Sequence, residues 1–148
     1  MDEQLKLEIN TIRDVLDSFE KSDFDSMSSF YHSSGFPRGC CGDATDLLAL
    51  YISKYHNKSS TYVCGVGLGD NPNQSHAWLI CDGYLIDITA DQFNEKGYNL
   101  PRVIFTKQSD FHCLFQSVKS HVFDAGSLNQ SAIPRVLIKV VGKMEATA

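Results

Sequence analysis

Apolar and polar positions alternate along this chain with two different periods, and the period changes near residue 60. Before that point, apolar side chains recur every three or four positions, which is the spacing of one helix face. Helices are predicted over residues 3–19, 24–31 and 41–55, with a loop over residues 32–37 where glycine and proline interrupt the pattern. The first 55 residues are therefore expected to be mainly helical.

Beyond residue 60, residues typical of strands dominate and the period shortens to two. Strands are predicted over residues 61–68, 75–81, 84–89, 103–105 and 136–141, with loops over residues 69–74 and 91–100. Asp82-Gly83 lies between two of these strands, and this dipeptide is a strong signal for a hairpin turn. Helices followed by an antiparallel sheet give an α+β class, and residues 1–148 are expected to form a single domain.

The composition narrows the class of protein. Hydrophobic residues make up 43% and charged residues 21% of the 148 positions, as in ordinary globular domains. The formal net charge is −5 and the 13 lysines and arginines are scattered, so we expect no nucleic-acid partner. The longest apolar run, from Leu47 to Ile52, is far shorter than the ~20 residues of a membrane span. With an acidic start and no secretory signal, we expect a cytoplasmic protein without a membrane partner, delivery into another cell remaining open.

The five cysteines fall into two groups. Cys64, Cys81 and Cys113 lie among apolar or strand-forming residues and are expected to be small buried side chains. Cys40 and Cys41 instead stand at the start of the helix predicted over residues 41–55. A thiol there faces free backbone N–H groups and the positive end of the helix dipole, which both favour the thiolate. The same N–H groups can hold an oxyanion.

The hairpin brings a histidine and a carboxylate together. Counting outward from an Asp82-Gly83 turn places His76 opposite Thr89 and Trp78 opposite Asp87, with all four side chains on one face. His76 and Asp87 are then diagonal neighbours. The opposite face is apolar throughout: it carries Ala77, Leu79, Cys81, Tyr84, Ile86 and Ile88. The hydrophobic pattern thus supports the register that pairs the histidine with the carboxylate.

A thiol, an imidazole and a carboxylate in this arrangement follow the logic of catalytic triads. In this hypothesis Cys41 attacks a carbonyl carbon. His76 takes the thiol proton and later protonates the leaving amine, while Asp87 orients the imidazole and stabilises the imidazolium. No cofactor and no metal are expected in this chemistry.

The order and the local motifs resemble the transglutaminase-like branch of the papain-like superfamily, which includes transglutaminases, cysteine peptidases, deamidases and arylamine N-acetyltransferases. The Gly-x-Cys-x-Asp motif of such proteins fits Gly39-Cys40-Cys41-Gly42-Asp43, and their His-Ala-Trp motif stands here as His76-Ala77-Trp78. Asp87 lies in the strand-like stretch after the turn, as in these enzymes. The resemblance covers about residues 36–93 and implies N-terminal helices packed on an antiparallel sheet. It also implies acyl transfer through a thioester on Cys41.

Two features depart from this family. The interval from His76 to Asp87 is short, which requires a tight hairpin. No glutamine stands shortly before Cys41 to donate to an oxyanion, so the Cys41 N–H needs a partner, with Trp78, Tyr31 and Gln92 as candidates. The residues predicted to contact substrate are Arg38, Gly39, Cys40, Trp78 and Gln92. Arg38 is otherwise a solvated loop charge, and residues 91–93 are expected to line one wall of the cleft. His112 and His121 lie outside every motif and are interpreted as surface or core residues.

These observations favour hydrolysis of a peptide or side-chain amide, as in a cysteine peptidase or glutamine deamidase, acting on a peptide or protein substrate. An amine acceptor would make the protein a transamidase or acyltransferase instead. A binding module that kept the fold and lost the chemistry is a third possibility, and so is a delivered effector, toxin or defence protein. Zinc held by Cys40, Cys41, His76 and Asp87 is disfavoured, because adjacent cysteines at a helix start point in different directions. The oligomeric state stays open.

Overall fold

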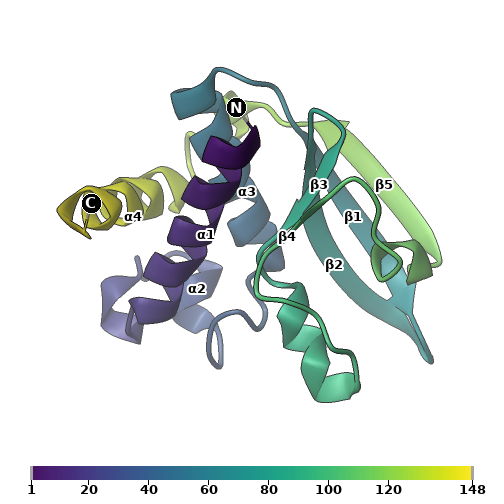
Figure 1. Cartoon of the computed structure of the whole chain (residues 1–148). Helices are drawn as coiled ribbons and strands as arrows, with labels where there is room; N and C mark the ends of the chain where they lie inside the picture. Colours follow the sequence, from purple (N-terminus) through teal and green to yellow (C-terminus); the bar gives the residue numbers. More distant parts are fainter. Residues whose placement is uncertain (1, 148) are drawn as a thin grey trace.

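In the computed structural model, which describes residues 2–147, helices pack against one face of an antiparallel sheet (Figure 1). The α-helices of the described residues are α1 (Asp2–Ser18), α2 (Ser29–His32), α3 (Cys41–His56) and α4 (Ile133–Thr147). The strands are β1 (Thr61–Leu68), β2 (Asn71–Cys81), β3 (Tyr84–Asp87), β4 (Ile104–Thr106) and β5 (Ser117–Val122), in the spatial order β4-β3-β2-β1-β5. The α+β class predicted from the sequence is confirmed. Among residues 2–147, no helix is long and apolar enough to cross a bilayer.

The central hairpin has the predicted register. Leu79 pairs with Ile86 and Cys81 with Tyr84 across β2 and β3. Asp82 and Gly83 both have positive φ, at 52° and 80°, as a two-residue type I′ turn requires. This turn matches the right-handed twist of the strands, so the local sequence is sufficient to set the register.

Several predicted boundaries are wrong. Residues 136–141 were expected to form a strand but lie within α4, whose buried residues Ile133, Val136, Leu137 and Val140 follow helical spacing. The helix expected over residues 24–31 is only the short α2, preceded by a 3-10 turn η1 (Lys21–Asp23). The loop expected over residues 69–74 shrinks because β2 begins at Asn71, and the loop over residues 91–100 contains the 3-10 helix η2 (Ala90–Lys96).

The main core lies between the helices and the inner face of the sheet. Its fully buried side chains include Ile9 and Ile12 of α1, Leu47 of α3, and Leu79 and Ile86 of the hairpin. Each such side chain contributes on the order of 1.5–3 kcal/mol of burial free energy. This core fixes α3, and therefore Cys41 at its start, against β2.

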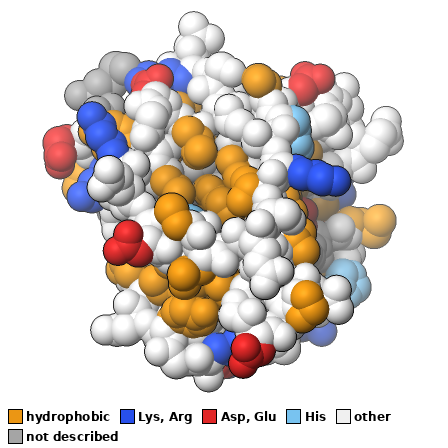
Figure 2. All heavy atoms as spheres, turned by 90° about the vertical axis from the view of Figure 1, so that its right-hand side faces the viewer, with side chains coloured by type: hydrophobic (Ala, Val, Ile, Leu, Met, Phe, Trp, Pro, Cys, Tyr) orange, Lys and Arg blue, Asp and Glu red, His pale blue; other side chains and the backbone are white. Residues whose placement is uncertain are grey.

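A second, mainly aromatic cluster lies on the other face of the sheet. It contains Trp78 from β2 and Phe93, Phe111 and Phe115 from the segments after β3 and β4. Gly65 of β1 is part of this packing, because a Cβ there would lie 2.7 Å from Phe115 and 2.8 Å from Trp78. Figure 2 shows the same side of the molecule, with hydrophobic side chains gathered over the middle of it. The aromatic cluster surrounds the predicted histidine.

Strand β5 was not predicted from the sequence. All six of its residues are exposed, and it is an edge strand that pairs only with β1. Because neither face of β5 is buried, its sequence lacks the alternation that identifies a half-buried strand.

Candidate active site

Cys41 is the first residue of α3 and is half-buried. The first backbone hydrogen bond of the helix runs from Ala44 N to Cys40 O, at 2.8 Å. The N–H groups of Cys41, Gly42 and Asp43 therefore precede the helical hydrogen-bond ladder, as at any helix start. Asp43 does not point at this site, since its carboxylate accepts a 2.8 Å hydrogen bond from Ser29 N in α2.

His76 of β2 is fully buried, and its two ring nitrogens have different surroundings. Nε2 lies 2.6 Å from Asp87 Oδ2, whereas Nδ1 has no hydrogen-bond partner among the described residues. Burial by itself lowers the pKa of His76, but the charge and hydrogen bond of Asp87 and the neighbouring Cys41 raise that pKa to about 10. The ring thus lies between a carboxylate and the Cys41 thiol and is able to carry a proton.

Asp87, at the end of β3, has hydrogen-bond donors on both oxygens. Oδ1 accepts from Thr89 N at 2.9 Å and from the Thr89 hydroxyl at 3.4 Å. Oδ2 accepts from His76 and also from His112 Nε2, at 2.7 Å. Burial by itself raises the pKa of Asp87, but the His76 charge and the hydrogen bonds from both histidines hold it well below its usual range. The carboxylate is therefore ionised and fully engaged.

His112 is a residue that the sequence interpretation missed. It lies in the short 3-10 turn η3 (His112–Leu114), is buried, and packs edge-on against Trp78 with ring centroids 4.6 Å apart. Its Nδ1 is 2.5 Å from the hydroxyl of Ser109. No motif marks it, and the aromatic-rich stretch from Phe111 to Phe115 is the only signal nearby.

His76, Asp87 and His112 are also the described residues that come closest to a metal-binding group, with ligand atoms within 4.8 Å of one another. Both histidine Nε2 atoms point at the same carboxylate oxygen at hydrogen-bond distance, so each must carry a proton there. A metal ligand needs a nitrogen lone pair in that position. The donor geometry therefore favours a hydrogen-bonded cluster over a metal centre.

Two of the residues predicted to contact substrate lie in the protein interior. Cys40 is 0% exposed, its Sγ lies 3.2 Å from the carbonyl of Arg38, and burial raises the pKa of its thiol to about 11. Trp78 is 3% exposed and packs against His112 and Phe115. The substrate-binding prediction disagrees with this burial for both, because residue 40 packs beneath the helix start and residue 78 supports the histidines.

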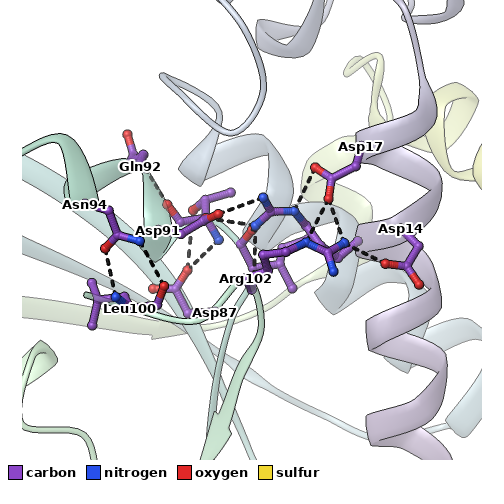
Figure 3. A network of polar contacts seen from close by, with 11 residues as sticks. Asp14, Asp17, Asp87, Asp91, Gln92, Asn94, Leu100 and Arg102 are labelled. Carbon is purple, nitrogen blue, oxygen red and sulfur yellow. Dashed lines mark hydrogen bonds and ion pairs between the residues drawn. The ribbon is translucent and has the colours of Figure 1, made fainter. Parts of the chain in front are cut away.

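The other predicted contact residues lie on segments near Cys41. Gly39 is exposed and has a φ of 68°, which lets the chain turn before the helix. Arg38 is exposed and forms an ion pair with Glu95 of η2, which ties the segment before Cys41 to that turn. Gln92 donates its side-chain amide to Thr89 O at 2.9 Å (Figure 3), so this donor is used within η2 rather than at an oxyanion.

Tyr62 of β1 is a further neighbour of the nucleophile that the sequence interpretation missed. Its hydroxyl is so close to the first turn of α3 that a Cβ at Gly42 would lie 3.2 Å from it. Burial, and then the charges of Asp46 and Cys41, raise the pKa of Tyr62 well above its usual range. The phenol therefore stays protonated and remains a hydrogen-bond donor beside the helix start.

A buried arginine holds the segment after Asp87 in place. Arg13 of α1 forms a bidentate ion pair with Asp91, with both contacts at 2.8 Å. It also donates to the carbonyl oxygens of Ile88 at 2.6 Å and of Arg102 at 2.9 Å. Figure 3 shows this network between Asp91, next to Asp87, and the carboxylates of α1. Asp91 thus faces the core and does not line the cleft as expected, whereas Phe93 contacts His76 edge-on, at 5.0 Å between ring centroids.

The remaining cysteines differ in exposure. Cys81 is buried as predicted, Cys64 is half-buried, and Cys113 is exposed, so the prediction for Cys113 is wrong. Comparison of the chain with protein-family models, curated proteins and solved structures found no match. The resemblance to transglutaminase-like enzymes rests on the motifs around Cys41, His76 and Asp87.

Proposed function

We propose that the protein transfers an acyl group from an amide through a thioester on Cys41, in the manner of a cysteine peptidase or glutamine deamidase. One observation carries this proposal. His76 is buried with Nε2 on Asp87, its Nδ1 has no partner, and Cys41 is the thiol near enough to raise its pKa. A base oriented by a carboxylate and open toward a nucleophile is the arrangement that thiol-dependent acyl transfer needs.

The proposed reaction proceeds in two halves. His76 accepts the Cys41 proton, and the thiolate attacks the substrate carbonyl carbon to give a tetrahedral oxyanion near the N–H groups at the start of α3. The imidazolium then protonates the departing nitrogen, the C–N bond breaks, and an amine or ammonia leaves a thioester on the sulfur. Water attacks the thioester while His76 takes its proton. Return of that proton to the sulfur releases the acid and restores the thiol.

Other readings of the same site differ in the second half. An amine that replaces water as acceptor gives a transamidase or acyltransferase through the same thioester. A module that binds a protein and carries out no chemistry would keep the fold and form no thioester. Either activity is compatible with an effector, toxin or defence protein that acts on one partner, and a peptide or protein is the proposed substrate in each case.

A product assay separates these readings. The protein is incubated with a library of glutamine-containing peptides, with and without hydroxylamine as an amine acceptor, and the products are identified by mass spectrometry. We expect new carboxylic acids without hydroxylamine, and at least a roughly 10³-fold loss of product in Cys41→Ser. Cys64→Ser, at a half-buried cysteine of β1, is the matched control and is expected to retain activity.

The three readings give different products. Hydroxamates alone would mean that the thioester prefers an amine and would replace hydrolysis by transamidation. An equal yield of acid from the wild type and Cys41→Ser would contradict the proposal. No product, and no acyl adduct on the Cys41 peptide, would favour the binding module.

A further inference from the structure

The Asp87 carboxylate is shared by two buried histidines, and the reaction proposed above uses only one of them. Oδ2 lies 2.6 Å from His76 Nε2 and 2.7 Å from His112 Nε2. Both imidazoles and the carboxylate are at most 4% exposed. A surface histidine beside a carboxylate is common, but here the second histidine is desolvated and directed at the same oxygen as the first.

The proton positions follow from the donors and acceptors. An ionised carboxylate only accepts, so His76 and His112 must each carry a proton on Nε2. Ser109 Oγ lies 2.5 Å from His112 Nδ1, and its hydroxyl can donate to that nitrogen. In this neutral form His112 is fixed as the tautomer that donates to Asp87. Ser109 also accepts from His112 N at 3.4 Å, which anchors the turn.

The packing around His112 leaves it little freedom. Trp78 lies edge-on to the ring at 4.6 Å and Phe111 at 5.1 Å, measured between ring centroids. The titratable groups that face it are Asp87, by its hydrogen bond, and His76, with ring centroids 6.1 Å apart. The Nε2–H of His112 is thus a rigid donor aimed at Oδ2.

We infer that His112 is a positioning residue of the proposed reaction, which holds Asp87 Oδ2 in line with His76 and so lets Asp87 stabilise the His76 imidazolium. The inference rests on the proposed function of Cys41, His76 and Asp87. Thr89 fixes the other carboxylate oxygen, and His112 supplies the second point that stops the group from rotating away from His76. A misdirected carboxylate stabilises the imidazolium less well, and the thiolate then loses its counter-ion at a higher pH.

The test uses two substitutions at one position. His112→Phe keeps an aromatic ring for Trp78 and removes the donor, whereas His112→Gln keeps an N–H close to the position of Nε2. Alkylation of Cys41 by iodoacetamide is followed from pH 5 to pH 9 by peptide-resolved mass spectrometry. In His112→Phe we expect the rate at pH 7 to fall by roughly tenfold, as for loss of one hydrogen bond to a charged group. The acid limb of the profile then moves up by about one pH unit.

Rescue and controls decide the outcome. His112→Gln is expected to restore most of the wild-type profile, and His32→Phe, at an exposed histidine, to leave it unchanged. An unchanged acid limb in His112→Phe, even with a lower melting temperature, would mean that His112 is only structural. A limb that moves to lower pH would mean that His112 competes with His76 for Asp87. Either result overturns the inference.

A parallel measurement on His76→Gln keeps this inference separate from the proposed function. If His76→Gln slows Cys41 alkylation and His112→Phe does not, only the positioning role fails. If neither substitution changes the rate, the proposed base is not acting on Cys41, and both fail together.

Discussion

Replacing Asp87 with asparagine is expected to slow alkylation of Cys41 at pH 7 by roughly 10- to 100-fold. The amide has no charge with which to stabilise a protonated His76. The interactions that raise the pKa of His76 include both the charge and the hydrogen bond of Asp87, and the substitution removes that charge. His76 then loses its proton more easily, and the Cys41 thiolate loses its counter-ion. Peptide-resolved alkylation with iodoacetamide measures the effect.

The same substitution also disturbs the fold. Oδ1 accepts from Thr89 N–H, and Oδ2 accepts from both histidines. Whichever way the asparagine amide is turned, its NH2 group meets a donor unless a histidine changes tautomer. We expect a loss of about 1–3 kcal/mol in the free energy of unfolding, the cost of one unsatisfied buried group.

Asp110→Asn is the matched control, because this aspartate is exposed on the same segment as His112. It is expected to change neither the alkylation rate nor the stability measurably. Equal alkylation rates in Asp87→Asn and the wild type would contradict the assigned role of Asp87.

Substitution of Arg13 by methionine is expected to lower the free energy of unfolding by about 3–5 kcal/mol. Methionine leaves the largely buried carboxylate of Asp91 without its bidentate partner. It also leaves the carbonyl oxygens of Ile88 and Arg102 without their donor. For a chain of this length the melting temperature should fall by roughly 10 °C. Urea unfolding followed by circular dichroism measures the change.

Arg102→Met provides the comparison, since this arginine pairs with two carboxylates of the same helix, Asp14 and Asp17, but is 52% exposed. An exposed ion pair of this kind is worth at most about 1 kcal/mol. Similar losses in the two variants would mean that burial of Arg13 does not set its contribution. A large loss confined to Arg13→Met would support its role as the tie between α1 and the segment after Asp87.

The part of the site built by local sequence could be predicted from the chain alone. The Asp82-Gly83 turn fixes the pairing of β2 and β3 through backbone preferences within a few residues. That pairing places His76 and Asp87 on the same face, so their contact follows from the register. The helix start at Cys41 is equally local, because the apolar spacing after it identifies one buried face.

The part built by long-range contacts could not be predicted in this way. His112 meets Asp87 across 25 positions and Arg13 meets Asp91 across 78, and no periodic pattern links residues so far apart. The burial of Trp78 and Cys40 depends on which segments cover each face of the sheet. Helix α4 was mistaken for a strand because its β-branched residues favour strands, while its tertiary packing selects the helix.

The most direct test of the central claim compares two thiols in one molecule at pH 7. Limiting iodoacetamide is added to the wild type and to His76→Gln, and the adducts on Cys41 and Cys113 are quantified by peptide mass spectrometry. An ordinary exposed thiol is only a few per cent thiolate at this pH. We predict that half-buried Cys41 reacts at least about tenfold faster than exposed Cys113 in the wild type, and no faster in His76→Gln. If Cys113 reacts faster in the wild type, or if Cys41 is indifferent to His76, the proposed triad is contradicted.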